Sequence, residues 1–213
     1  MRIEVWSDVM CPWCYIGKRR LESALARFEH QDEVEVIWRS FELRPQHPGP
    51  PRETLGELMQ RRLDTGPAGV VKLFSWIETV GLAEGLELKL VTARPVRSFD
   101  AHRLVHLAAA SGLAGEMKER LLRAYLVDNA NVADYDVLVD AARAVGLDAD
   151  DTRRALDAGA GSDGVLADEA RAAELGISSV PTFVVDGDER VAGVVPADEL
   201  LELIRRSSRL ATG

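Results

Sequence analysis

The sequence predicts an α/β fold in which a large all-helical segment interrupts a small domain built around one β-sheet. Short apolar segments rich in β-branched residues occur at residues 3–9 and 34–39, and again at 182–195. Between residues 53 and 175, apolar residues recur instead at intervals of three and four, and no segment has the texture of a strand. The simplest assembly joins the two ends of the chain into one sheet and makes the middle an insertion.

The N-terminal segment predicts a strand, a helix and a parallel strand. Residues 3–9 are short, apolar and partly alternating, and residues 34–39 alternate with period two. A helix between them, to about residue 29, is favoured because Pro12 can occupy the first turn without losing a needed donor. The resulting βαβ unit places two cysteines, Cys11 and Cys14, at the start of its helix.

The middle of the chain predicts a series of helices. Prolines, among them Pro48, Pro50 and Pro51, interrupt the pattern between Arg44 and about Gly69. Asp134 is placed as an N-cap and Gly146 as a residue that ends a helix. The segments with helical periodicity are 55–62, 70–81, 99–110, 117–127, 135–145, 151–158 and 162–175.

The C-terminal segment predicts a hairpin and a last helix. Residues 182–185 and 190–195 have strand texture, and Asp186-Gly187 between them is a turn dipeptide. Pro196 then opens the terminal helix. The predicted division is residues 1–44 and 176–213 for the two parts of the sheet domain and residues 45–175 for the helical insertion.

Composition limits the classes of function. The chain has 213 residues, 26 Lys and Arg against 35 Asp and Glu, and a net charge of −9. This acidic balance disfavours nucleic-acid binding, which needs clustered basic residues. The charged N-terminus does not resemble a signal peptide, and no stretch is apolar enough to span a membrane, so we expect no membrane contact and a cytoplasmic location. In that reducing compartment, the only two cysteines are expected to be catalytic or metal-binding.

The motif Cys11-Pro12-Trp13-Cys14 carries the strongest chemical signal. It follows a predicted strand and opens a helix, where unpaired N–H groups and the helix dipole favour a thiolate at Cys11. Cys14, one turn further in, is expected to keep its proton until Cys11 forms a mixed disulfide, and then to attack that bond. The spacing therefore predicts a redox-active cysteine pair.

The two cysteines have two other possible interpretations. They are either inert core residues or half of a zinc site, but zinc needs about four ligands and the chain has no further cysteine. His102 and His106 lie at positions i and i+4 of a predicted helix without a third ligand in register, which favours ordinary helix residues. We therefore expect no metal.

A glycine pattern at residues 159–164 matches the G-x-G-x-x-G fingerprint of dinucleotide-binding proteins. That fingerprint requires a preceding strand, whereas residues 151–158 have helical periodicity. Asp163 inside the pattern would also repel a pyrophosphate. A turn between two helices is the better interpretation.

Val180-Pro181 begins a predicted strand, where proline is tolerated only at an edge or a first position. A cis bond there would leave the N–H and C=O groups of Val180 free to pair with an extended peptide. The residues alone leave the cis and trans forms both open.

With these motifs placed, the chain resembles the DsbA family of thioredoxin-fold thiol oxidoreductases, and within it the cytosolic FrnE-like branch. The resemblance covers essentially the whole chain. It rests on the segments Ser7-Asp8-Val9-Met10-Cys11-Pro12-Trp13-Cys14-Tyr15-Ile16-Gly17, Phe41-Glu42-Leu43-Arg44-Pro45, Phe99-Asp100-Ala101-His102-Arg103-Leu104 and Gly176-Ile177-Ser178-Ser179-Val180-Pro181-Thr182-Phe183.

The resemblance implies a thioredoxin fold with an inserted helical domain. It further implies that Cys11 is the nucleophile and Cys14 the resolving thiol, and that Pro181 is in cis and faces them. The function expected on this basis is thiol–disulfide exchange on protein or small-molecule disulfides. The residues expected to contact the substrate are Pro12, Trp13, Tyr15, Val180 and Pro181.

The same branch resembles 2-hydroxychromene-2-carboxylate isomerases and kappa-class glutathione transferases, which typically carry serine where Cys11 stands. The intact cysteine pair favours redox work and requires no bound cofactor, while glutathione stays open as reductant or co-substrate. Two alternatives are therefore kept: a glutathione-dependent isomerase or transferase, and a non-enzymatic redox-sensing or peptide-binding module. The direction of the redox reaction, the substrate and the oligomeric state are not readable from the sequence.

Overall fold

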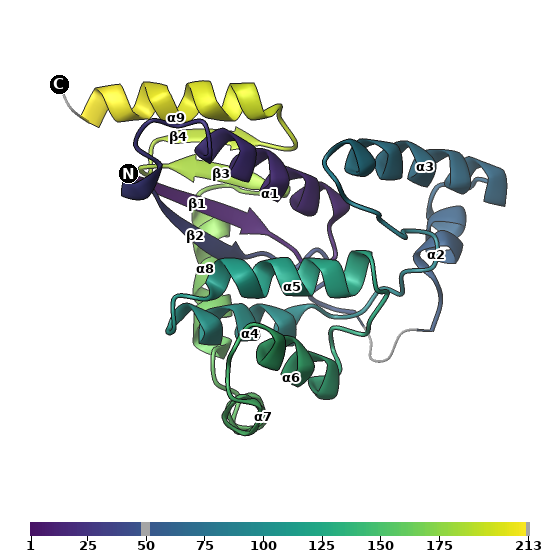
Figure 1. Cartoon of the computed structure of the whole chain (residues 1–213). Helices are drawn as coiled ribbons and strands as arrows, with labels where there is room; N and C mark the ends of the chain where they lie inside the picture. The colour runs from purple at the N-terminus through teal and green to yellow at the C-terminus, as the bar shows by residue number, and fades with distance from the viewer. Residues whose placement is uncertain (48–51, 212–213) are drawn as a thin grey trace.

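The computed structural model describes residues 1–47 and 52–211, so Pro48, Pro50 and Pro51 lie outside the described residues. One four-stranded sheet with the order β2-β1-β3-β4 stands at the centre of the fold. Its strands are β1 (Arg2–Ser7), β2 (Glu35–Ser40), β3 (Thr182–Val185) and β4 (Glu189–Ala192). β1 pairs in parallel with β2 and antiparallel with β3, so the two ends of the chain share one sheet, as predicted (Figure 1).

Two helices of the sheet domain cover one face of this sheet. They are α1 (Pro12–Leu25) and α9 (Ala197–Ala211), with a short 3-10 turn at Gln31–Glu33 before β2. Ile3 and Val5 of β1 and Phe183 of β3 are buried against apolar side chains of both helices. The alternation along β1 turns Trp6 to the opposite face, where it packs with Val184 and with Ala172 of helix α8.

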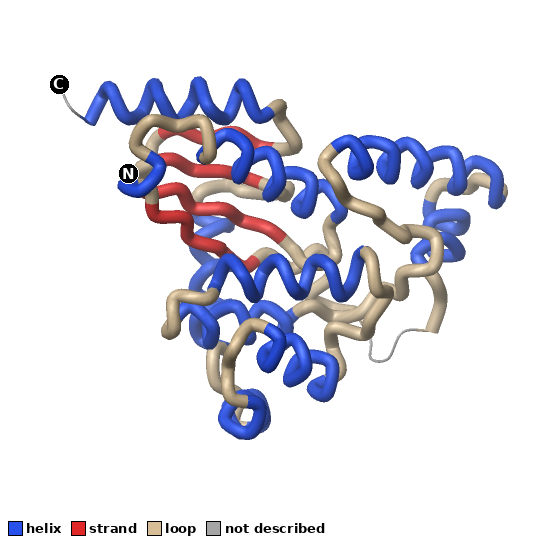
Figure 2. The backbone as a smooth tube through the Cα atoms, in the orientation of Figure 1, coloured by secondary structure: helices blue, strands red, loops and turns tan. Residues whose placement is uncertain are grey.

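The region between β2 and β3 contains helices and no strand within its described residues 52–175. Figure 2 shows these helices beside and below the sheet. They are α2 (Leu55–Arg62), α3 (Pro67–Ala83), α4 (Phe99–Ala109), α5 (Ala114–Leu126), α6 (Tyr135–Ala144), α7 (Ala149–Asp157) and α8 (Ser162–Glu174). The fold class predicted from the sequence is thereby confirmed, while the exact limits of the insertion stay a prediction.

Local sequence accounts for several element boundaries. The Asp134 side chain caps α6 by accepting a hydrogen bond from the N–H of Asp136, as predicted. The first strand is shorter than predicted because the chain turns at Asp8, whose carbonyl accepts the Cys11 N–H at 3.2 Å. The last strand also ends early, at Ala192, because Gly193 takes a φ of 86°.

The glycine pattern at residues 159–164 forms a turn between α7 and α8, as the sequence indicated. Gly161 takes a φ of 83°, and a Cβ there would stand 2.8 Å from the carbonyl oxygen of Arg103 on α4. A Cβ at Gly164 would stand 2.7 Å from Nδ1 of His106. These glycines therefore serve close packing of α8 on α4.

None of the helices in the described part of the chain is long and apolar enough to cross a bilayer.

Candidate active site

The two cysteines open helix α1 at the junction between the sheet domain and the insertion. Cys11 is the N-cap of α1 and Pro12 occupies its first turn, half-buried. The backbone N–H of Cys14 donates to the carbonyl of Cys11 at 3.0 Å, which places Cys14 one turn deeper. Cys11 is 5% exposed and Cys14 2% exposed, and both carry free thiols. Both pack into the apolar core of the helical insertion.

The environment of Cys14 keeps its thiol protonated. Burial, followed by the hydrogen bond and charge of Cys11, raises the pKa of Cys14 well above its usual value. The backbone N–H of Asp8 and the charge of Lys118 act in the opposite direction. Cys14 is therefore poised to keep its proton while Cys11 carries charge, which is what a resolving thiol needs.

The segment before β3 meets the cysteines across the fold. The Val180–Pro181 peptide bond is cis. Cys11 Sγ lies 3.8 Å from the carbonyl oxygen of Val180, although the two residues are 169 positions apart. On the neighbouring turn of α1, Gly17 allows close approach, because a Cβ there would stand 3.0 Å from Cγ of Pro181.

An apolar groove of about 500 Å³ adjoins this contact. Its walls come from the motif, from the segment around Pro181 and from α3 of the insertion. Trp13 and Trp76 stack edge to face with their ring centroids 5.2 Å apart, and Trp76 is 58% exposed. The lining residues are Trp13, Arg20, Trp76, Val80, Val180, Pro181, Gly193 and Val194. Three of the residues expected to contact substrate, Trp13, Val180 and Pro181, therefore line one groove.

Tyr15 does not offer the exposed aromatic surface that the sequence suggested. Its side chain is 1% exposed, and its hydroxyl donates to Oε1 of Glu119 on α5 at 2.6 Å. Because helix α1 turns this position toward the insertion, Tyr15 joins the two parts of the fold instead of facing the groove.

Asp8 connects three of the segments that carried the sequence resemblance. Its carboxylate is fully buried and accepts the N–H of Met10 at 3.1 Å and the N–H of Leu43 at 2.7 Å. Nε2 of His102 lies 3.5 Å from Oδ1 of Asp8. Burial raises the pKa of Asp8, but His102 and the two backbone donors outweigh it and hold that pKa below its usual value. A carboxylate thus stands behind the cysteine turn.

Lys118 is a buried ammonium group in the same place. The side chain is 1% exposed, and its Nζ donates to the carbonyl of Ser7 at 3.1 Å. Burial lowers the pKa of Lys118 to about 8, while the charges of Cys14 and Asp8 act to raise it. Sequence reasoning missed this residue, although a signal existed: Lys118 lies on the apolar stripe that continues with Leu121, Leu122 and Tyr125.

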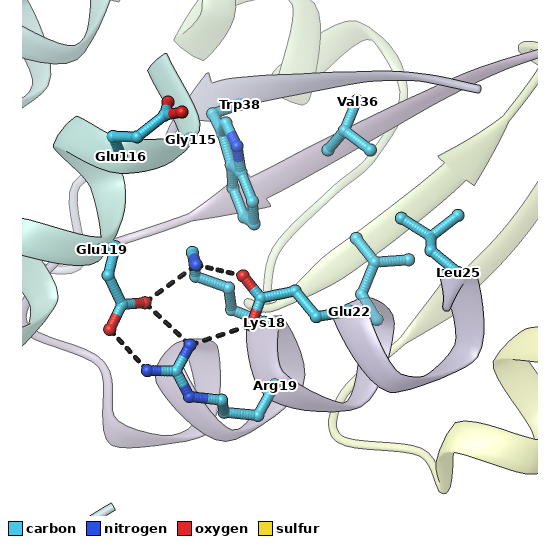
Figure 3. A pocket seen from close by; sticks show the side chains of 10 residues that line it. Lys18, Arg19, Glu22, Leu25, Val36, Trp38, Gly115, Glu116 and Glu119 are labelled. Carbon is cyan, nitrogen blue, oxygen red and sulfur yellow. Dashed lines mark hydrogen bonds and ion pairs between the residues drawn. The ribbon is translucent and has the colours of Figure 1, made fainter. Parts of the chain in front are cut away.

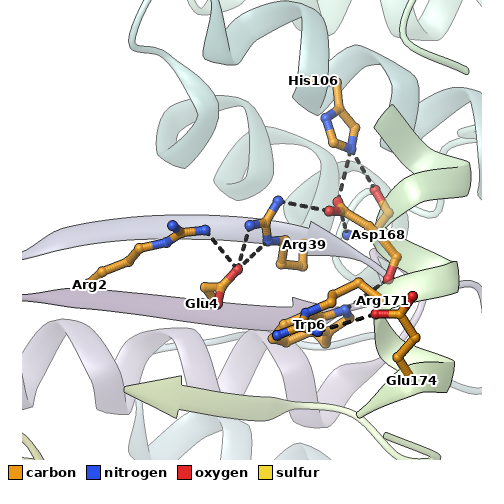
Figure 4. A network of polar contacts seen from close by, with 9 residues as sticks. Arg2, Glu4, Trp6, Arg39, His106, Asp168, Arg171 and Glu174 are labelled. Carbon is orange, nitrogen blue, oxygen red and sulfur yellow. Dashed lines mark hydrogen bonds and ion pairs between the residues drawn. The ribbon is translucent and has the colours of Figure 1, made fainter. Parts of the chain in front are cut away.

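The second histidine of the predicted helix belongs to a separate polar network (Figure 4). His106 Nε2 lies 3.1 Å from Oδ2 of Asp168 and 3.0 Å from Oγ of Ser40. A Ser-His-Asp triad needs the acid and the serine on opposite ring nitrogens, so this group is not one. Among the described residues, no group of three or more potential metal ligands comes together.

A further hollow of about 510 Å³ lies between α1, β2 and α5, and its lining includes neither cysteine. Figure 3 shows four of its charged residues, Lys18, Arg19, Glu22 and Glu119, pairing with one another, while Glu116 stands apart from them. Most of its charged side chains are therefore paired within the protein.

Comparison with known proteins now identifies the family. A family model described as a DSBA-like thioredoxin domain matches residues 2–205. The chain belongs to this DSBA-like family. The resemblance inferred from the sequence is confirmed by this match.

Solved structures agree with the DSBA-like assignment. A probable DsbA oxidoreductase from Streptomyces coelicolor is 36% identical, with a TM-score of 0.92 over 98% of this chain and 90% of that one. A cytosolic disulfide reductase, DsbM from Pseudomonas aeruginosa, is 20% identical, with a TM-score of 0.62 over 100% and 98%. A 2-hydroxychromene-2-carboxylate isomerase is 18% identical, with a TM-score of 0.68 over 99% and 96%. The last two show a shared fold.

Proposed function

We propose that this DSBA-like protein is a thiol–disulfide oxidoreductase in which Cys11 and Cys14 form the redox pair. One observation carries the proposal: Cys11 caps α1 with Cys14 one turn deeper, and Cys11 Sγ lies 3.8 Å from the Val180 carbonyl beside an open apolar groove. A helix N-terminus is a favourable position for an anionic sulfur, and a substrate in the groove would reach Cys11 beside the Val180 carbonyl.

The proposed reaction has two exchanges. The Cys11 thiolate attacks a substrate disulfide, a bond forms between Cys11 and one substrate sulfur, and the other sulfur leaves as a thiolate. Cys14 then attacks Cys11, the Cys11–substrate bond breaks, and the enzyme disulfide forms as the substrate is reduced. Run in reverse, the same steps oxidise a dithiol. Trp13 and Trp76 would hold apolar substrate groups, and the Val180 backbone would pair with an extended segment.

The proposed substrates are disulfide- or thiol-containing polypeptides or small molecules, with no nucleic acid and no membrane. The proposed location is the cytosol, where a reducing thiol pool returns the pair to the dithiol. Glutathione is the proposed reductant or co-substrate, and no tightly bound cofactor is needed for either exchange.

The test is to trap the intermediate. A Cys14→Ser variant mixed with a disulfide-containing peptide should accumulate a covalent adduct through Cys11, because no second thiol releases it. Intact mass spectrometry before and after dithiothreitol measures the adduct. The matched control, Cys11→Ser, should form little adduct, since burial raises the pKa of the Cys14 thiol and keeps it protonated. Failure of Cys14→Ser to form the adduct, or equal adduct formation by both variants, would contradict the proposal.

The glutathione-dependent alternative makes a different prediction for the same variant. An isomerase or transferase that only activates glutathione should keep its turnover without Cys14 and show saturable glutathione binding. A non-enzymatic sensor or peptide-binding module would react with insulin or another disulfide substrate once and stop. Multiple turnovers that require both cysteines would separate the oxidoreductase from these two alternatives.

A further inference from the structure

Lys118 differs from the other buried lysine near the start of α1. Lys18, also buried, pairs with Glu22 and lies 2.8 Å from Oε2 of Glu119. Lys118 is 1% exposed and donates to a backbone carbonyl, that of Ser7. Within residues 1–47 and 52–211, no carboxylate oxygen comes within 4 Å of its Nζ. A buried ammonium without a close carboxylate is costly, and such groups are retained where their charge is used.

The charged and titratable groups that face Lys118 come from every element around it. The two sulfurs, Cys11 and Cys14, lie on α1. Asp8 follows β1, and its carboxylate is already occupied by the N–H groups of Met10 and Leu43. The remaining groups are His102 on α4 and Asp168 on α8. Oδ1 of Asp168 accepts a hydrogen bond from Arg39 at 2.9 Å, so the negative charge of Asp168 is largely neutralised by that cation.

We propose that Lys118 is a positioning residue whose buried positive charge stabilises the Cys14 thiolate during release of the mixed disulfide. The inference rests on the proposed function and adds a role for the helical insertion, since α5 supplies the charge. The pKa of Cys14 is raised by burial and by Cys11, and Lys118 is among the groups that oppose this rise. The charge supplied by the insertion thereby favours ionisation of Cys14 in the second exchange.

The step balances without an outside oxidant. Cys14 gives its proton to solvent, its electron pair forms the Cys14–Cys11 bond, and the Cys11–substrate bond breaks. The departing substrate sulfur leaves with the electron pair and takes up a proton. Lys118 keeps its own proton throughout and acts only through its charge, which the low dielectric of the site strengthens.

The second exchange can be timed with Ellman's reagent, 5,5′-dithiobis(2-nitrobenzoate). Attack by Cys11 releases one coloured thiolate, and attack by Cys14 on the mixed disulfide releases a second. In stopped flow, the second phase therefore reports the resolving step. Lys118→Met, which removes the charge at similar length, should slow this phase about tenfold at pH 7, which equals a shift of its pH profile by about one unit.

Two variants separate charge from packing. Lys118→Arg keeps the charge and should restore most of the second phase. Leu122→Ala, at a buried position one turn along α5, should lower the melting temperature but leave the pH profile of the second phase in place.

A measurement on the unmodified protein keeps the inference testable if Lys118→Met does not fold. Because coupling between two charges is reciprocal, the Nζ of Lys118 should titrate at higher pH in the reduced protein than in the disulfide form. Nitrogen NMR of the lysine side chains measures both. Equal titration in the two forms, or an unchanged second phase in folded Lys118→Met, would overturn the role of Lys118 and leave the proposed function intact. Absence of a second phase in the unmodified protein would overturn the proposed function itself.

Discussion

Two groups of buried charges fasten the helical insertion to the sheet, and they differ in how completely their members are paired. The Asp168 cluster consists of Glu4, Arg39, Ser40, His106 and Asp168 (Figure 4). The Asp8 cluster consists of Asp8, His102 and Lys118. Both connect strand ends to helices of the insertion. Only the second lies behind the cysteines.

Pairing in the Asp168 cluster is complete around its carboxylate. Oδ1 of Asp168 accepts from Arg39 at 2.9 Å, and Oδ2 accepts from the Ser40 N–H at 2.8 Å. His106 supplies a further contact to Oδ2. In the Asp8 cluster, Nε2 of His102 makes no hydrogen bond, and the nearest acceptor of Lys118 is a neutral carbonyl. The comparison teaches that the incompletely paired buried charges lie beside the two cysteines, where the proposed thiol chemistry would use them.

The largest expected effect is loss of Asp8. Asp8→Ala removes a buried carboxylate that accepts two backbone N–H groups, lies 3.5 Å from His102 and is one of the negative charges acting on Lys118. We expect the free energy of unfolding to fall by about 3–5 kcal/mol in urea titrations. Asp188→Ala, at an exposed position of the hairpin, should change it by less than about 0.5 kcal/mol. Similar unfolding midpoints for the two variants would contradict the prediction that Asp8 contributes strongly to the stability of the fold.

A smaller effect is expected at Arg39, and it should be confined to stability. Arg39→Met removes the cation that Glu4 and Asp168 share, although Glu4 keeps its contact with Arg2 and the partial exposure of Arg39 screens the loss. We expect the free energy of unfolding to fall by about 2 kcal/mol. Both phases of the reaction with Ellman's reagent should keep the rates of the unmodified protein. A slowed second phase in this variant would remove the contrast between the two clusters.

The pH dependence of stability should reflect His102. Burial lowers the pKa of His102 despite the opposing effect of Asp8. The unfolded chain therefore binds this proton more readily than the folded protein, so stability is complete above about pH 6.5 and declines as the pH falls below it. We expect a loss of about 1 kcal/mol between pH 7 and pH 5.5, measured by urea titration at each pH. His102→Asn should flatten this slope, and an unchanged slope would exclude His102 as its source.

The sequence predicted the elements and the motif well because both depend on local pattern. Strand alternation, the proline of the first helical turn and the Asp186-Gly187 turn each act over a few residues. Contacts between residues that are far apart in the sequence were harder to predict. The family resemblance implied that Pro181 faces the cysteines, but neither the contact of the Val180 carbonyl with Cys11 nor the placement of Trp76 beside Trp13 was predicted. Nothing local to Trp76 indicates which helix it will face.

The burial of polar side chains was the other feature that could not be predicted from the sequence. The sequence predicts that Tyr15 contacts the substrate, whereas its side chain is buried in the core beside the insertion. Its hydroxyl donates to Glu119, which lies 104 positions away. Lys118 was overlooked because lysines are usually exposed, and only its position on an apolar stripe distinguishes it. Tertiary packing decides such cases, and no local pattern encodes it.

The smallest effect is expected at Glu22, in the charged group between α1 and α5 (Figure 3). Its side chain is 46% exposed, and both of its cationic partners, Lys18 and Arg19, also contact Glu119. Glu22→Gln should therefore lower the free energy of unfolding by less than about 0.5 kcal/mol, and added salt should shrink the difference. Urea titration at low and high ionic strength measures both. If Glu22→Gln lowered the free energy of unfolding as much as Asp8→Ala does, the number of ionic contacts, and not their burial, would determine how much each cluster contributes to stability.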